Sequence, residues 1–120
     1  MDYDITIPAN KDYVFVKVNR DITKPFAEEY TKAAIEIGKK NGRFKLLVDV
    51  RGRSSSSGAL GKYQFAHEGS VKVGLTRAWK IVVLRDKDKI DMQFLETVMQ
   101  NAGYNYRVLS SEEEAIEWLK

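Results

Sequence analysis

The sequence contains no cysteine and a single histidine, His67, among its 120 residues. Without cysteine the chain can form no disulfide, no thiolate nucleophile and no cysteine-based metal site. One histidine alone cannot build a histidine-rich zinc site or a cysteine–histidine catalytic pair. These absences exclude several classes of metalloprotein and covalent catalyst, and we predict neither a metal nor a cofactor.

The chain also lacks a long apolar run and a basic patch. No apolar stretch approaches the length of a membrane span, and residues 1–4 form neither a basic nor an apolar leader. The net charge of +3 comes from 20 basic and 17 acidic residues mixed along the chain, whereas nucleic-acid binders concentrate their basic residues. We therefore predict a cytoplasmic protein with no membrane span and no nucleic-acid partner.

Length and composition are typical of one globular domain. A chain of 120 residues with 43% hydrophobic and 31% charged residues can bury one continuous core, and it is too short for two ordinary domains. Residues 1–120 are accordingly interpreted as a single domain.

Apolar runs and period-two alternation predict five strands. They cover residues 3–7, 13–18, 44–50, 79–84 and 106–109. The first strand alternates with polar residues and is expected at an edge, whereas the runs at 14–18, 46–50 and 81–84 are expected at the centre of the sheet.

The clearest predicted helix follows Thr23, a residue suited to the N-cap position, and ends at Asn41 and Gly42. The expected inward face consists of Phe26, Tyr30, Ala33, Ala34 and Ile37.

Three further helices are predicted. A weaker one begins at Gly58, and residues 71–75 fit either its tail or an extended connection. Another is expected to be capped by Asp86 or Asp88, with Phe94 facing inward and Gly103 as its stop. Ser110 and Ser111 each precede a glutamate by three residues, the spacing of a capping box for the last helix.

The resulting order, ββαβαβαβα, predicts the α/β class. Strands separated by helices pair in parallel through right-handed crossovers. We expect a single mixed, mostly parallel sheet of about five strands with about four helices.

Signatures of common enzymes are missing. No G-x-S-x-G elbow or G-x-G-x-x-G fingerprint occurs, and a phosphate loop ending in Gly61 and Lys62 would need glycine where the chain has Ser56. Four carboxylates near the expected rim could hold Mg²⁺ or serve acid–base chemistry but show no specific spacing: Asp21, Asp49, Asp86 and Asp88. We therefore predict that the domain is not an enzyme.

Ligands of parallel sheets bind beyond the carboxyl ends of the strands. The loops there carry serines, arginines and a strand-ending aspartate, which suit an anion or an acidic partner. The candidate ligand or partner rim consists of Arg20, Asp21, Thr23, Asp49, Arg51, Ser54, Ser55, Ser57 and Gly58. Arg53 adds positive charge nearby.

The element order, the run FKLLVDVR at 44–51, the run WKIVVL at 79–84 and the closing EEAIEWL at 113–119 together resemble the SpoIIAA-like proteins. That family is similar to STAS domains and is grouped with CRAL-TRIO lipid-binding folds. In STAS antagonists a phosphorylated serine lies in a stretch similar to residues 55–61 here. The resemblance implies an STAS-like fold with Ser56 as the phosphoacceptor.

Three functions remain open on this basis. The first is a regulatory protein-interaction module of the STAS type, with a protein partner or a homodimer. The second is a pocket for a lipid or other small apolar ligand, and the third is an enzyme of unrecognised type.

Overall fold

The structure, a computed structural model of the chain, describes residues 2–55, 68–89 and 92–120. Its five strands form one sheet in the order β1-β2-β3-β4-β5. β1 (Tyr3–Thr6) pairs antiparallel with β2 (Val14–Val18), and β3 (Lys45–Asp49), β4 (Lys80–Leu84) and β5 (Asn105–Leu109) continue the sheet in parallel. The predicted α/β class and mostly parallel sheet are confirmed.

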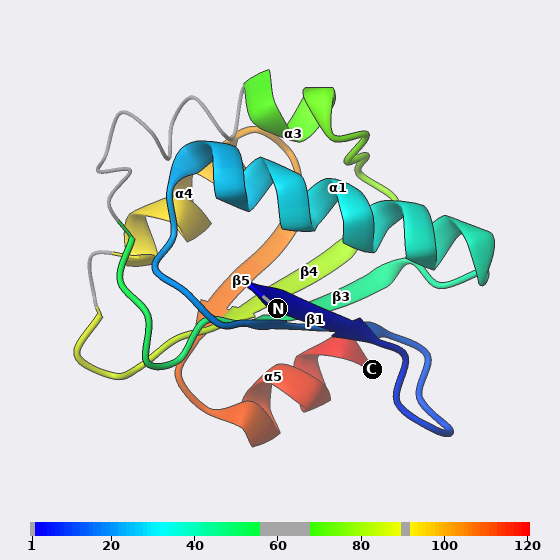
Figure 1. Cartoon of the computed structure of the whole chain (residues 1–120), viewed down its shortest axis with the longest axis horizontal. Helices are drawn as coiled ribbons and strands as arrows, with labels where there is room; N and C mark the ends of the chain where they lie inside the picture. The colour runs from blue at the N-terminus through cyan, green and yellow to red at the C-terminus, as the bar shows by residue number, and fades with distance from the viewer. Residues whose placement is uncertain (1, 56–67, 90–91) are drawn as a thin grey trace.

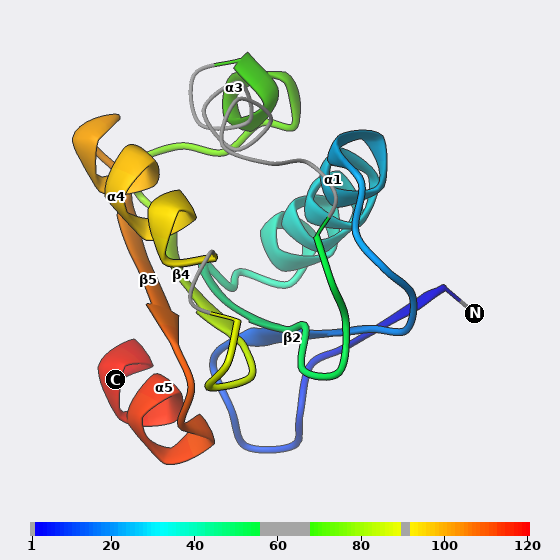
Figure 2. The same cartoon turned by 90° about the vertical axis from the view of Figure 1, so that its left-hand side faces the viewer.

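The helices divide unequally between the faces of the sheet (Figures 1 and 2). α1 (Lys24–Lys40), α3 (Ser70–Lys72) and α4 (Gln93–Asn101) lie on one face, and α5 (Glu112–Leu119) lies on the other. From β2 to β5 each connection moves to the next strand in the same direction. Right-handed crossovers then place every connecting helix on the same face, which leaves the opposite face to the C-terminal helix.

Local signals explain where α1 begins and ends. The Oγ1 atom of Thr23 accepts a hydrogen bond from the backbone N–H of Phe26 at 3.3 Å, and Pro25 occupies the first turn. Gly42 follows the helix with a φ of 69°, a left-handed conformation that glycine adopts without steric cost. Both ends agree with the sequence prediction.

The buried face of α1 is rotated from the predicted one. The residues buried on this helix are Phe26, Tyr30, Thr31, Ala34, Ile35 and Gly38. Ala33 and Ile37, which were expected inside, are only half-buried. The helix lies close to Trp79 at Gly38, where an added Cβ atom would lie 2.5 Å from Cη2 of Trp79. This close contact draws the Ile35 side toward the core.

The start of α4 also corrects the prediction. The helix begins at Gln93 without a side-chain cap, and Asp86 instead accepts a hydrogen bond from the backbone N–H of Gly52 at 2.6 Å. Phe94, expected inside, is 41% exposed, because the inward face of the helix passes through Val98 and Met99.

The remaining helix predictions have different outcomes. Ser111 caps α5 as expected, since its Oγ atom accepts a hydrogen bond from the N–H of Glu114. Val71 belongs to the short helix α3. The helix predicted to begin at Gly58 lies outside the described residues, apart from its tail.

The two faces of the sheet bury separate hydrophobic clusters. The larger lies under α1 and α4 and includes the alternate valines of β2 and the side chain of Trp79. The smaller lies under α5 and consists of Tyr13, Leu47, Val82, Leu84, Ala115 and Leu119. One short helix therefore closes an entire face.

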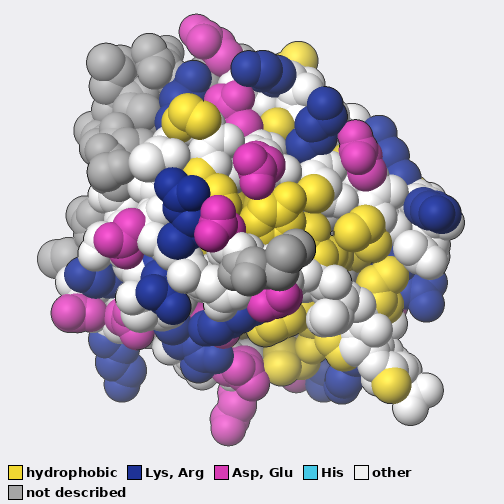
Figure 3. Space-filling model, in the orientation of Figure 1, with side chains coloured by type: hydrophobic (Ala, Val, Ile, Leu, Met, Phe, Trp, Pro, Cys, Tyr) yellow, Lys and Arg dark blue, Asp and Glu magenta, His cyan; other side chains and the backbone are white. Residues whose placement is uncertain are grey.

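The two edges of the sheet differ in protection. At β5, Glu96 accepts a hydrogen bond from the N–H of Val108, and Gln100 donates one to the carbonyl of Tyr106. These contacts from α4 occupy backbone groups that an added strand would need. At the β1 edge, half-buried apolar side chains contribute to the hydrophobic surface in the middle of Figure 3.

Within the described residues, none of the helices combines the length and the apolar character that crossing a membrane would require.

Candidate functional site

Two loops meet at the carboxyl edge of the sheet, one after β2 and one after β3. Ile22 forms a parallel bridge with Ser55, and the backbone N–H of Ile22 donates to the carbonyl of Ser54 at 2.8 Å. The carboxylate of Asp21 accepts a hydrogen bond from the N–H of Ser54 at 3.0 Å. The segment that leads into α1 is thus fastened to the start of the serine-rich loop.

A second group is organised by Asp49, whose side chain is buried although it is charged. Its carboxylate accepts hydrogen bonds from the backbone N–H, Nε and an Nη atom of Arg51 at 2.9–3.1 Å. Lys17, its neighbour on β2, lies 3.3 Å away. Arg51 also pairs with Glu112 at 3.0 Å, so this network ties the end of β3 to the first turn of α5.

These contacts determine the protonation of Asp49. Burial alone would raise the pKa of its carboxyl group, but the hydrogen bonds from Arg51 and the positive charges of Arg51 and Lys17 outweigh that effect. The pKa of Asp49 therefore lies below its ordinary value. The same side-chain hydrogen bonds raise the pKa of Arg51. The pair is charged at neutral pH and is structural in character.

The residues of the predicted rim therefore fall into two separate groups in the structure. Asp49 shares the α5 face with Leu47, whereas Ser54 and Ser55 lie beside the segment that enters α1. The hydrogen bond from Gly52 to Asp86 joins the loop after β3 to the loop after β4. Thr23 is occupied as the cap of α1.

The arginines of the rim have separate surroundings. Arg20 pairs with Asp2 at 3.2 Å, and its guanidinium lies 4.6 Å from the ring centre of Phe26. Arg53 donates its backbone N–H to the carbonyl of Val50, and its buried Nε atom has no hydrogen-bond partner among the described residues. Ser56, Ser57 and Gly58 lie outside the described residues, so their assignment stays a prediction.

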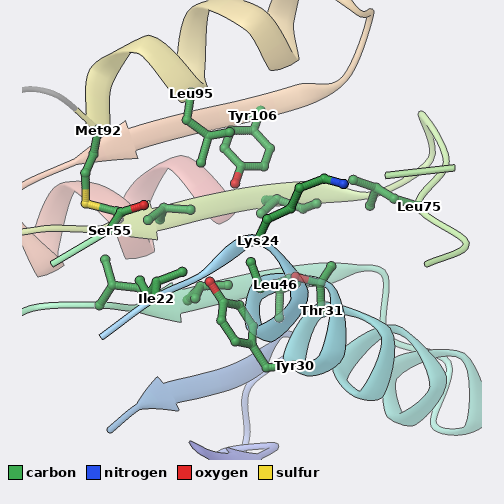
Figure 4. Close-up of a pocket in the computed structure, with 15 residues that line it drawn as sticks. Ile22, Lys24, Tyr30, Thr31, Leu46, Ser55, Leu75, Met92, Leu95 and Tyr106 are labelled. Atoms are coloured by element: carbon green, nitrogen blue, oxygen red, sulfur yellow. The ribbon is translucent and has the colours of Figure 1, made fainter. Parts of the chain in front are cut away.

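Sequence reasoning missed a cavity on the α1 face of the sheet. It has a volume of about 50 Å³ and lies between α1, α4 and the central strands (Figure 4). Most of its lining is aliphatic. The lining residues are Ile22, Lys24, Ala27, Tyr30, Thr31, Leu46, Val48, Val50, Ser55, Leu75, Ile81, Val83, Met92, Leu95 and Tyr106. They come from many segments of the chain, and no local motif could reveal them together.

Two tyrosines give this cavity a polar interior. Tyr30 is 7% exposed and Tyr106 is 6% exposed. Within the described part of the chain no hydrogen bond of either hydroxyl is found, and both side chains line the cavity. Burial raises the pKa of both hydroxyls, so both remain protonated at neutral pH. A phenol hydroxyl that borders a cavity and has no protein acceptor can donate its hydrogen bond to a molecule inside the cavity.

A metal centre finds no support in the described ranges, where no three or more histidine, aspartate or glutamate side chains gather closely enough to hold an ion. The carboxylates of the edge are engaged in pairs and hydrogen bonds instead, as those of Asp21, Asp49 and Asp86 illustrate.

Comparison with known proteins gives two matches. A model of the SpoIIAA-like family matches residues 13–120. A probable TonB-dependent siderophore receptor, PirA, from Acinetobacter baumannii is 30% identical over 95 residues. That match covers 79% of this chain, and the chain spans only 12% of the receptor.

Proposed function

This chain belongs to the SpoIIAA-like family, and on that premise we propose that it is a non-enzymatic regulatory module of the STAS type that binds a protein partner. Family membership supports a regulatory or interaction role in general. The finer part of the proposal is that the partner binds at the carboxyl edge of the sheet and that the serine loop, residues 54–57, controls it.

The observation that carries this proposal is the bridge between Ile22 and Ser55. It holds the start of the serine loop beside the first turn of α1, a helix of 17 residues with no acidic residue in that turn. No carboxylate of that turn therefore compensates the positive end of the helix dipole. A phosphate on Ser56 would bring about two negative charges to the same edge.

The arginines at this edge suit an acidic partner surface, whose carboxylates would take the place of the exposed acidic side chains of Asp2 and Glu112. The Arg20 side chain is about half exposed, and Arg51 and Arg53 follow β3 nearby. Lys and Arg residues are otherwise mixed with acidic ones along the chain, so we propose a protein partner and no nucleic acid. Cytoplasmic location and homodimer formation stay predictions.

The test compares Ser56→Asp, which imitates the phosphate charge, with Ser56→Ala and with wild type. We expect Ser56→Asp to change partner capture or self-association, measured by cross-linking mass spectrometry and native mass spectrometry. Thr97→Asp adds the same charge to an exposed position on α4 and is the matched control. Equal behaviour of Ser56→Asp and Thr97→Asp would contradict the proposal.

Positive charge is tested with Arg20→Ala rather than Arg51→Ala, because loss of Arg51 would leave the buried Asp49 carboxylate with fewer partners. Lys40→Ala, at the exposed C-terminal end of α1, is the control. We expect weaker partner binding for Arg20→Ala alone, and an equal loss in both variants would argue against this edge.

A second candidate function, binding of a small apolar ligand, is favoured by the cavity under α1 and α4. An apolar pocket with a few convergent polar groups is a common form of ligand site. Native mass spectrometry of the purified protein tests this candidate, since a retained apolar molecule supports it. Ser55 of the serine loop lines the cavity, so retention that is the same in wild type and Ser56→Asp would mean that charge at position 56 does not control the ligand.

A further inference from the structure

We propose that the cavity recognises the neutral carbonyl group of a small, otherwise apolar ligand, with Tyr30 and Tyr106 as the two hydrogen-bond donors. This inference rests on the second candidate function, a ligand site under α1 and α4. It adds the chemical class of the ligand and the residues that select it.

The first observation is the placement of the two hydroxyls. Tyr30 comes from α1 and Tyr106 from β5, and both line the same cavity. Figure 4 shows the two side chains entering from opposite walls, with their hydroxyl oxygens turned toward the interior. The Tyr30 group contributes to the raised pKa of Tyr106, as neighbouring phenols would.

The second observation is the chemistry that surrounds these hydroxyls. Val48, Val83 and Leu95 are among the apolar side chains that complete the wall. Both phenols stay protonated, so each offers a proton, and among the described residues neither has an acceptor. A carbonyl oxygen has two lone pairs and can accept from both donors at once.

An entirely apolar ligand fits this cavity less well. Water inside a polar cavity would bond to the hydroxyls, and a hydrocarbon that displaced it would leave both donors unsatisfied. A ligand carbonyl reproduces those hydrogen bonds while its alkyl groups contact the aliphatic wall. The cavity should therefore prefer a ketone or an ester to the hydrocarbon of the same shape.

A carboxylate is also disfavoured. Lys24 is the cationic residue of the lining, and its Nζ atom lies 3.6 Å from Glu28, which also pairs with Lys72 on α3. Figure 4 shows the Lys24 side chain extending toward Leu75, away from the two hydroxyls. An anion beside the tyrosines would be buried without a cation, which is far more costly than burying a neutral carbonyl.

The volume limits the size of the group. A single water needs about 10–15 Å³, whereas sites for drug-sized ligands have about 300–1,000 Å³. At about 50 Å³ the cavity accepts a group of a few non-hydrogen atoms. Suitable probes are 2-butanone, its isostere 2-methyl-1-butene, in which CH₂ replaces the oxygen, and the anion propionate.

The experiment titrates each probe into the full chain and follows backbone amide resonances by two-dimensional NMR. We expect 2-butanone to shift resonances around the cavity, such as those of Ile22 and Leu95, and to bind at least about fivefold more tightly than 2-methyl-1-butene. Propionate should cause no shifts there. In Tyr30→Phe and Tyr106→Phe the preference for the ketone should fall, while binding of the alkene is kept or improved.

Tyr13→Phe removes a hydroxyl from the α5 face and is the matched control, which should keep the preference for the ketone. Equal binding of ketone and alkene in wild type would leave the apolar site intact and overturn the carbonyl assignment. Binding of propionate as tight as that of 2-butanone would do the same. If no probe shifts resonances of the cavity, the ligand-site function fails together with this inference.

Discussion

The two faces of the sheet bury their apolar side chains in different ways. Under α5, a small cluster of apolar side chains joins one helix of 8 residues to three central strands. Under α1 and α4, a larger cluster surrounds a cavity lined by two tyrosines, whose hydroxyls have no hydrogen-bond partner among the described residues. The first face is packed around one helix, whereas the second keeps a cavity beside two tyrosine hydroxyls.

Two adjacent leucines of β3 give the largest expected contrast between the faces. Leu46 and Leu47 are each 1% exposed, but Leu46 lines the cavity and Leu47 packs under α5. Substitution of a buried leucine by alanine costs about 2–5 kcal/mol. We expect Leu47→Ala to lower the free energy of unfolding by about 3–5 kcal/mol and Leu46→Ala by about 2–3 kcal/mol, because Leu46 has fewer contacts to lose.

Urea denaturation of both variants measures this difference, and their shared strand and equal exposure make each the control of the other. A loss for Leu46→Ala that equals or exceeds the loss for Leu47→Ala would mean that the cavity face is packed as tightly as the α5 face.

The next largest loss of stability is expected at Asp49, which pairs with Lys17 and Arg51. Removing one partner of a buried ion pair costs about 3–5 kcal/mol, but Lys17 and Arg51 are each more than a third exposed and would regain water. We therefore expect Asp49→Ala to destabilise the fold by about 2–3 kcal/mol. Asp12→Ala is the control, since Asp12 pairs with Lys45 at the exposed surface and should cost under about 1 kcal/mol.

Asp49 also predicts a dependence of stability on pH. Its pKa is lower in the folded than in the unfolded chain, so its contribution is fully present above the unfolded pKa of about 3.9 and is lost as the pH falls through the folded pKa. The stability difference between wild type and Asp49→Asn should therefore be largest near neutral pH and shrink below about pH 4. A difference that stays constant from pH 7 to pH 3 would contradict this role.

Loss of the N-cap of α5 is expected to lower the free energy of unfolding by a smaller amount. Ser111→Ala removes the hydrogen bond to the N–H of Glu114 and should cost about 1 kcal/mol, measured by thermal or urea unfolding. Ser110→Ala tests the neighbouring serine, which does not cap the helix. If the two substitutions cost the same, the cap contributes nothing specific to the closure of this face.

Much of the fold could be predicted because its signals are local. The caps at Thr23 and Ser111 and the turn at Gly42 depend on residues a few positions apart. The errors came from tertiary contacts. Asp86 bonds to Gly52 rather than to a helix end, and Gly38 turns α1 through its contact with Trp79.

The candidate site was harder to predict than the fold. Sequence reasoning named Asp21 and Ser54, which the structure joins, but it did not foresee that Asp49 faces α5. The cavity was missed because Tyr30 and Tyr106 are far apart in sequence and each has the pattern of an ordinary core aromatic. Only the packed structure brings both side chains to one cavity.

The smallest expected effect compares the buried tyrosines of the two faces. Tyr30→Phe removes a hydroxyl that has no partner among the described residues, so its cost of burial disappears and no hydrogen bond is lost. We expect the free energy of unfolding to stay equal or to rise by up to about 1 kcal/mol. Tyr13→Phe, on the α5 face, should change it by no more than about 0.5 kcal/mol. Urea denaturation at neutral pH measures both. A loss of more than about 1 kcal/mol of unfolding free energy for Tyr30→Phe would mean that its hydroxyl is hydrogen-bonded in the folded protein. The expected difference in hydrogen bonding between the two faces of the sheet would then be wrong.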